Sequence, residues 1–232
     1  MMKWSITDLQ VDVDAVLRAQ GADPVILRKR KPRLVDIAAN ALDIGIDLLR
    51  PQVFSRELKV GVLKHEKLTL EDGHSISGGW ITRQLAPAES IHAILCTVGE
   101  QVEKEASKYM DTDMMLGLAL DGVGSAGVEA LAQLACRQIE DQALLTKQKT
   151  TVPLSPGMIN WSVDEGQPVF FKLLDSVNDQ VTLSPSFMMS PRKSLSMLVG
   201  VGTKLDEKGS TCDYCAMQGT CKYRQYSDHE LA

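Results

Sequence analysis

The sequence lacks a hydrophobic run long enough to cross a membrane, since no apolar stretch approaches the roughly 20 residues that a transmembrane helix needs. The best candidate, Met114–Leu120, stops at Asp121. The first residues also lack the apolar stretch of a signal peptide, and acidic residues follow soon after them. We therefore expect a cytoplasmic protein with no membrane partner.

An excess of basic residues is also lacking, because 25 Lys and Arg stand against 30 Asp and Glu, a formal net charge of −5. Such a chain is not built to coat nucleic acid, and we expect no nucleic-acid partner. One segment, Arg28–Arg33, nevertheless holds five basic residues in six. A solvated approach to a helix, a docking surface for an acidic partner and a phosphate contact are all compatible with it.

Several catalytic signatures are missing as well. The chain has no G-x-S-x-G elbow and no G-x-x-x-x-G-K phosphate loop, and its four His show no metal-pair spacing. The segment Gly122–Gly127 fits G-x-G-x-x-G, which a dehydrogenase would use to bind a nicotinamide or flavin cofactor. The preceding residues read as a helix as easily as a strand, and no second strand ends in an acid. We therefore favour close helix packing through these glycines.

The pattern of apolar residues predicts an α+β protein, because strands, helices and strands follow one another without regular alternation. Strands are predicted at residues 58–62, 67–70, 75–81, 91–98, 181–183, 187–189 and 196–201, with a hairpin turn at Asp72-Gly73. Helices are predicted before residue 21 and at residues 34–50, 100–109, 114–145 (as one or two) and 167–175.

Three of the five Cys crowd into the end of the chain, as Cys212, Cys215 and Cys221. Thiolates are soft ligands, and a Cys-x-x-Cys spacing lets two sulfurs meet one metal ion. The three therefore form a candidate site for zinc or an iron–sulfur cluster. The fourth ligand would be Cys96, Cys136, His229, a small molecule or a partner. The plain alternatives are three reduced surface thiols in a loose tail or one adventitious disulfide.

Three segments of the last third resemble the activation domain of cobalamin-dependent methionine synthase. They are Pro153–Met158 with a Pro-Gly turn, Phe170–Asp175 ending in Leu-Leu-Asp, and Leu183–Ser196, which contains Ser-Phe-x-Met-x-Pro-x-x-Ser-x-Ser. Cys96–Gly99 and Asp121–Glu129 are similar to free-standing members of that family. The resemblance implies a curved antiparallel sheet with flanking helices over residues 1–205, and leaves residues 206–232 as a separate Cys-rich tail.

The family domain binds S-adenosylmethionine and docks over the corrinoid of its partner, so the resemblance implies ligand-binding roles for particular residues. They are Glu129, Ser155, Pro156, Gly157, Met158, Ser194 and Ser196. The family acid on the helix before the loop aligns near Gln133, one turn after Glu129. Two departures stand out: Pro153 replaces the Arg that begins the family loop, and Met158 replaces its Tyr. Since Arg forms a forked pair with a carboxylate and Pro cannot, the departures predict weakened S-adenosylmethionine binding.

For function, the resemblance implies an accessory or reactivation protein of a corrinoid methyltransferase system. It would help return Co(II) to the active state by reduction or reductive methylation, with cobalamin carried by a corrinoid protein or a methionine synthase core. A flavodoxin- or ferredoxin-type protein would donate electrons, and an iron–sulfur cluster in the tail would reach the low potential needed. The alternative is a non-catalytic module that binds a corrinoid protein and has lost S-adenosylmethionine binding. The sequence identifies no catalytic residue.

Overall fold

The computed structural model describes residues 5–175, 178 and 180–206. Its helices are α1 (Val13–Ala19), α2 (Pro24–Arg30), α3 (Pro32–Gly45), α4 (Gly79–Leu85), α5 (Gln101–Met110), α6 (Met114–Leu145) and α7 (Val163–Leu174), with 3-10 turns at Ile6–Asp8 and Ile46–Leu48. Its strands are β1 (Gln52–Lys64), β2 (Lys67–Leu70), β3 (Ser75–Ser77), β4 (Ser90–Thr97), β5 (Lys149–Thr150), β6 (Thr182–Leu183), β7 (Met189–Ser190) and β8 (Ser194–Gly202).

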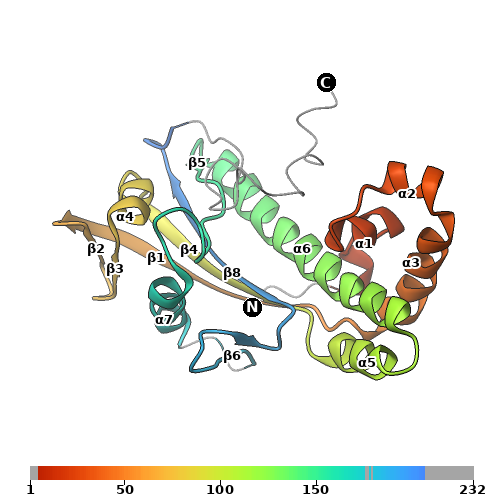
Figure 1. Ribbon diagram of the computed structural model, residues 1–232. Helices are drawn as coiled ribbons and strands as arrows, with labels where there is room; N and C mark the ends of the chain where they lie inside the picture. Colours follow the sequence, from red (N-terminus) through yellow and green to blue (C-terminus); the bar gives the residue numbers. More distant parts are fainter. Residues whose placement is uncertain (1–4, 176–177, 179, 207–232) are drawn as a thin grey trace.

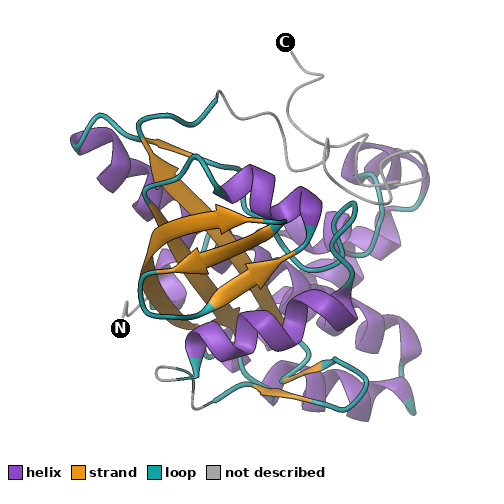
Figure 2. Cartoon of the chain, turned by 90° about the vertical axis from the view of Figure 1, so that its left-hand side faces the viewer, coloured by secondary structure: helices purple, strands orange, loops and turns teal. Residues whose placement is uncertain are grey.

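Six strands form one antiparallel sheet in the order β3-β2-β1-β4-β8-β5, and β6 pairs with β7 in a separate hairpin. The long strand β1 pairs with β4 along its first part and with β2 along its second. Its register with β2 shifts between Val60 and Leu63, which is the irregularity expected where a strand bends. The sheet is curled, as Figure 2 shows. These features confirm the predicted α+β class and its antiparallel sheet.

Helices cover both faces of this sheet, so the chain has two hydrophobic cores (Figure 1). The long helix α6 crosses one face and packs against α1, α3 and α5. On the other face, α7 contacts β1, β4 and β8. The central strand β4 serves both cores, since Ile94 and Cys96 point into the first while Ala93 and Leu95 point into the second. Its continuous burial follows from this position.

Helix α6 is the central element of the first core. The carboxylate of Asp113 caps it by accepting a hydrogen bond from the backbone N–H of Leu116 at 3.1 Å. Its length and apolar composition would allow it to cross a membrane, but 61% of its apolar window is buried inside the structure. That is the burial of a core helix, and it explains why apolar residues surround α6 almost completely.

The glycines of the G-x-G-x-x-G segment lie within α6 and face neighbouring elements. A Cβ atom on Gly122 would lie 2.9 Å from Nε2 of Gln20, and one on Gly127 would lie 2.7 Å from Cδ1 of Leu49. No strand precedes the motif, because it sits inside one continuous helix. Close helix packing is therefore confirmed as the reason for these glycines.

Several predicted elements differ from the structure: the strand predicted at residues 58–62 is longer, Gln52–Lys64, and the helix predicted at residues 167–175 begins at Val163. The strand predicted at residues 75–81 ends at Ser77, because Gly78 has φ +127° and α4 begins directly after it. The strand predicted at residues 187–189 is shorter and later, since Phe187 has a positive φ of 61° and only Met189–Ser190 pair with β6. Helix α2 was not predicted; Asp23 caps it by accepting from two backbone N–H groups, and Pro24 occupies its first turn.

Candidate functional site

A cavity of about 440 Å³ lies between the C-terminal half of α6, the loop that follows β5, and β8. It is lined by Glu129, Ala132, Gln133, Cys136, Arg137, Glu140, Pro153, Ser155, Leu195 and Met197. Two of the residues predicted from the family resemblance, Glu129 and Ser155, are among them. The lining thus joins three segments that are far apart in the sequence.

The periodicities of helix and strand account for this lining. On α6 the contributing positions recur every three or four residues, so they form one stripe along the helix. On β8, Leu195 and Met197 are two residues apart and therefore point to the same side of the sheet. The stripe on α6 is charged at its rim, and the strand supplies an apolar wall.

Three ionisable side chains give the cavity its electrostatic character. Glu129, Arg137 and Glu140 come from the same face of α6, so two carboxylates flank one guanidinium. Glu129 and Arg137 are exposed and Glu140 is half-buried, which keeps all three within reach of solvent. The cavity can thus hold a ligand that carries charges of both signs beside an apolar body.

Sulfur atoms form the inner side of the cavity. The thiol of Cys136 lies 3.4 Å from the thioether sulfur of Met197, and both residues are buried. Behind them, burial raises the pKa of the Cys96 thiol well above its ordinary range, and the nearby Cys136 and Glu129 raise it further. Cys96 is therefore a neutral thiol at physiological pH and a part of the first core.

The loop Pro153–Met158 is held firmly against the sheet. Leu154 forms an isolated bridge with Leu198 of β8, and the N–H of Gly157 donates to the carbonyl of Trp161 at 2.8 Å. Gly157 has φ +99°, a conformation that glycine adopts readily. The thioether sulfur of Met158 accepts the N–H of Ser155 at 3.4 Å, so this side chain folds back onto its own loop.

Ser194 and Ser196 point to the opposite face of β8 from the cavity. Both are buried: the hydroxyl oxygen of Ser194 lies 2.7 Å from the carbonyl oxygen of Pro191 and 2.9 Å from the hydroxyl oxygen of Thr97, so its single hydrogen has two acceptors within reach. The hydroxyl of Ser196 donates to the side-chain oxygen of Gln167 at 3.2 Å. The structure therefore places Glu129 and Ser155 together and sets the two serines of β8 apart from them.

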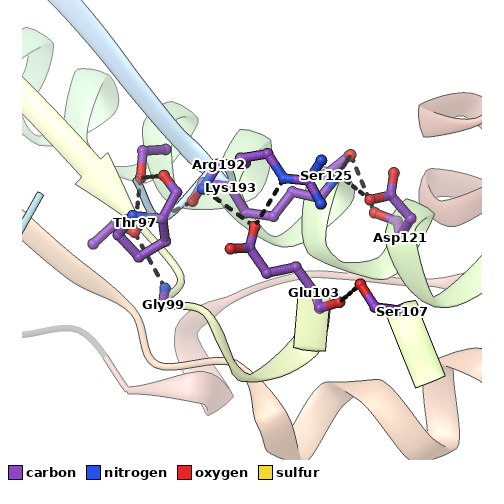
Figure 3. A network of polar contacts seen from close by, with 10 residues as sticks. Thr97, Gly99, Glu103, Ser107, Asp121, Ser125, Arg192 and Lys193 are labelled. Atoms are coloured by element: carbon purple, nitrogen blue, oxygen red, sulfur yellow. Dashed lines mark hydrogen bonds and ion pairs between the residues drawn. The ribbon is translucent and has the colours of Figure 1, made fainter. Parts of the chain in front are cut away.

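A network of polar contacts fixes the segment before β8 (Figure 3). The ammonium group of Lys193 lies 2.8 Å from a carboxylate oxygen of Asp121 and 2.9 Å from the hydroxyl of Ser125, both on α6. The backbone N–H of Arg192 donates to the carboxylate of Glu103 on α5 at 3.2 Å. The start of β8 is thus tied to two helices, which sets the strand's position along α6.

A second cavity, of about 530 Å³, lies where β4 leads into α5. Its lining is mostly uncharged and polar: Arg50, Gln52, Thr97, Gly99, Glu100, Gln101, Gln180, Thr182, Ser190 and Pro191. The guanidinium of Arg50 donates to the carbonyls of Asp47 and Leu49 at 2.8 Å each. With that cation held by the backbone, amide and hydroxyl groups dominate this cavity.

The predicted metal ligands Cys212, Cys215 and Cys221 lie outside the described residues. Within residues 5–175, 178 and 180–206, no group of three or more His, Cys, Asp or Glu could hold a metal ion. Two of the suggested fourth ligands, Cys96 and Cys136, are buried in the first core.

The chain was compared with known proteins at the level of sequence and of structure. No protein-family model matches it, and no curated protein matches its sequence. Among solved structures it is similar to the MetH reactivation domain, in a crystal structure of that domain bound to AdoHcy. The TM-score is 0.65 at 14% sequence identity, over 90% of this chain and 79% of that one.

The fold is that of the methionine synthase reactivation domain. This confirms the fold that the resemblance implied, with its curled antiparallel sheet and flanking helices. The reactivation-domain likeness is one of backbone, since only 14% of the aligned residues are identical.

Proposed function

We propose that this chain is an accessory protein of a corrinoid methyltransferase system, which helps return a corrinoid on a partner protein from Co(II) to its active state. The fold supports a related role, because it is shared with the reactivation domain of a cobalamin-dependent enzyme. The observation that carries the proposal is the cavity between α6 and β8, whose charges complement S-adenosylmethionine.

S-Adenosylmethionine carries two positive groups, a sulfonium and an ammonium, together with one carboxylate and an adenosine whose adenine ring has two flat apolar faces. The cavity offers two carboxylates, on Glu129 and Glu140, and one guanidinium, on Arg137. An apolar wall that includes Leu195 and Met197 is suited to a face of the adenine ring. Its volume of about 440 Å³ lies within the roughly 300–1,000 Å³ usual for small-molecule sites. Charge and size therefore both suit this ligand.

Arg137 supplies the guanidinium that the loop Pro153–Met158 lacks. Pro153 lines the same cavity but offers no donor, so the loop itself cannot form a forked pair with a ligand carboxylate. A guanidinium on α6 would make that pair from the opposite wall. We propose that Glu129 and Ser155 bind the ligand with Arg137, while Pro156 and Gly157 shape the loop.

The proposed reaction balances with one electron and one methyl group. One electron from a flavodoxin- or ferredoxin-type donor reduces Co(II) to Co(I) on the partner. The reduced corrinoid of the partner would accept the methyl group as a cobalt–carbon bond forms, and the breaking carbon–sulfur bond would leave its electron pair on sulfur to give S-adenosylhomocysteine. In this scheme the chain binds and orients the sulfonium ligand, and the corrinoid belongs to the partner, a corrinoid protein or a methionine synthase core in the cytoplasm.

The Cys-rich tail remains a proposed metal site within a proposed separate segment, residues 206–232. Cys212, Cys215 and Cys221 would hold an iron–sulfur cluster that passes the electron, or a zinc ion that fixes the tail. Protein purified without oxygen tests this by its visible spectrum and its iron, zinc and sulfide content. Broad absorbance near roughly 400 nm with matching iron and sulfide supports the cluster; protein free of iron and zinc rules out both.

The second candidate function is a binding module that docks on a corrinoid protein without using S-adenosylmethionine. Pro153 and Met158 favour it, because the first offers no donor to the cavity and the second folds back onto Ser155. In this case the stripe on α6 would be a solvated helix face.

Titration calorimetry separates the two candidates. We expect S-adenosylmethionine to bind with micromolar affinity, and Arg137→Gln to weaken S-adenosylmethionine and S-adenosylhomocysteine alike, about tenfold each. Glu140→Gln should weaken S-adenosylmethionine more than S-adenosylhomocysteine, because only the former has a sulfonium. Glu71→Gln on the distant hairpin is the control and should change neither affinity. Absence of saturable binding by the wild-type protein would select the binding module.

A further inference from the structure

A basic patch lies on α2 and the start of α3, at the outer end of the helical lobe whose helices Figure 1 shows. Helix α2 carries Arg28, Lys29 and Arg30 in its last turn, and Lys31 and Arg33 stand at the start of α3. All five side chains are exposed. Five of the 25 Lys and Arg of the chain gather here, which leaves 20 against 30 Asp and Glu elsewhere. The patch is therefore an isolated positive area on an otherwise acidic protein.

Two exposed apolar side chains lie within this basic patch. Val25 is 60% exposed and Ile26 is 48% exposed. Lys29 and Arg30 follow them at helical spacings of three and four residues, so the four share one face of α2. The inner side of the helix is provided by Leu27, which packs against the first core. The outer face of α2 thus combines a small apolar spot with a rim of cations.

Local helix stability does not account for all of these cations. Basic residues suit the last turn of α2, because a helix C-terminus carries partial negative charge. The start of α3 is the opposite case: Lys31 occupies the N-cap without a side-chain cap hydrogen bond, Arg33 lies in the first turn, and that turn contains no acidic residue. Cations at a helix N-terminus are unfavourable, so their presence there suggests a role outside the helix.

Intramolecular ion pairs use little of this charge. The guanidinium of Arg28 pairs with the carboxylate of Asp14 on α1. For Lys29, Arg30, Lys31 and Arg33, the described part of the chain provides no ion pair within 4 Å. Four positive charges therefore face solvent around Val25 and Ile26.

We propose that the outer face of α2 with the start of α3 is a docking surface for an acidic protein, one that presents carboxylates around a small apolar spot. A protein partner fits better than DNA or an anionic membrane, because those extended polyanions would also meet the acidic remainder of this chain. A discrete basic patch suits a transient interface, in which complementary charge speeds and orients the encounter.

The test uses the full-length protein and a purified flavodoxin as the acidic probe, followed by calorimetry or surface plasmon resonance at low and high salt. The choice of probe rests on the proposed function, while the patch does not. We expect binding at about 20 mM salt that weakens at least tenfold at about 300 mM, as screening of complementary charge predicts. The triple variant Lys29→Glu/Arg30→Glu/Arg33→Glu should lose at least tenfold in affinity at low salt.

Two controls distinguish docking from unfolding or general charge. The triple variant should change the melting temperature little, because the Glu in the first turn of α3 favours that helix while the two Glu in the last turn of α2 disfavour theirs. Lys104→Glu/Lys108→Glu, on the exposed side of α5, lowers the net charge by four units, against six for the triple variant, and should alter affinity less than twofold. Val25→Ser/Ile26→Ser should weaken binding by an amount that salt does not change.

Three outcomes would overturn the proposal. The first is flavodoxin binding that both charge variants weaken equally, and the second is no salt-dependent binding to flavodoxin at all. The third is tighter binding of a 20-base-pair DNA, or of vesicles with about 30% phosphatidylserine, than of flavodoxin, with the same loss in the triple variant. None of these results bears on the cavity beside α6, whose ligand binding is measured separately.

Discussion

The side chain of Lys193 crosses from the segment before β8 to Asp121 on α6, with 2.8 Å between the ammonium nitrogen and a carboxylate oxygen. Only 13% of the Lys193 side chain is exposed, while Asp121 is 44% exposed. The pair therefore lies at the edge of the core, where water screens one partner and protein surrounds the other. The ammonium group of Lys193 also donates a hydrogen bond to the hydroxyl of Ser125, which satisfies a second of its N–H donors.

Replacing Lys193 should destabilise the protein, which should still fold. We expect Lys193→Met to lower the free energy of unfolding by about 1–2 kcal/mol, since a charge-assisted hydrogen bond is lost while the apolar stem is kept. Urea unfolding measures the change. Lys104→Met on α5 is the matched control, because its pair with Glu100 is exposed and should contribute no more than about 0.5 kcal/mol. Equal losses in both variants would contradict the role given to Lys193.

The glycines of α6 differ in what an added methyl group would meet. Gly127→Ala should cost about 1–3 kcal/mol, because its Cβ would lie 2.7 Å from the fully buried Leu49. Gly122→Ala meets the end of the exposed Gln20 side chain, which can move aside. That variant should be neutral or gain up to about 1 kcal/mol from alanine's helix propensity. Thermal and urea unfolding of the two variants measure these changes in stability. A larger loss for Gly122→Ala than for Gly127→Ala would contradict the packing described for α6.

The imidazole of His92 on β4 gives the stability a dependence on pH. Burial lowers the pKa of this imidazole. The nearby carboxylate of Glu57 partly offsets that decrease, and the ammonium group of Lys59 adds to it. The folded state thus favours neutral His92, whereas the unfolded chain takes up a proton near the ordinary value of about 6.5. Stability from this group is present above that pH and is lost as pH falls through the folded-state pKa. We expect the urea midpoint to fall between about pH 7 and pH 5, and His92→Gln to flatten that fall.

The matched control for this pH profile is His65→Asn, in the tight turn between β1 and β2. Residue 65 has a positive φ of 49°, which asparagine tolerates, and its imidazole is exposed. This variant should keep the wild-type slope. A slope that responds to residue 65 and not to residue 92 would assign the acid sensitivity elsewhere.

The two buried cysteines should respond differently to an alkylating reagent. Cys136 lines the cavity, whereas Cys96 lies in the core with a raised thiol pKa. We expect iodoacetamide at pH 8 to modify Cys136 slowly and Cys96 not at all in the folded protein, as read from peptide masses. Saturating S-adenosylmethionine should slow the modification of Cys136 several-fold. An unchanged rate at saturation would place the bound ligand outside this cavity.

Much of the fold could be predicted from the sequence where local pattern and tertiary environment agree. The alternation of residues 67–70 and the Asp72-Gly73 turn predicted a hairpin that the structure contains. The continuous apolar run of residues 91–98 predicted a buried strand, now the centre of the sheet. Helix α2 was missed because its seven residues are too few to show a period, and only the Asp23-Pro24 start signals it.

The cavity was harder to predict, because it forms where distant segments meet. Family resemblance pointed to Glu129 and Ser155, which do line it, whereas Arg137 and Glu140 were missed. Their spacing from Glu129 on one helix is a signal that the sequence contains. Which face of α6 meets β8, however, follows from packing across more than 60 residues, and no local pattern encodes it. The prediction that Ser194 and Ser196 belong to the same site is wrong, because side chains alternate along β8 and these two lie on the face opposite the cavity.

The unbroken course of α6 has a consequence for anything that binds at its two ends. The lobe that carries α2 is packed against the N-terminal half of this helix through α1 and α3, and the cavity opens beside its C-terminal half. At 1.5 Å per residue, the 16 residues from Leu120 to Cys136 span about 24 Å. A protein bound to the lobe and a small molecule bound beside β8 would thus be separated by the length of this helix segment. Each could bind and dissociate without displacing the other.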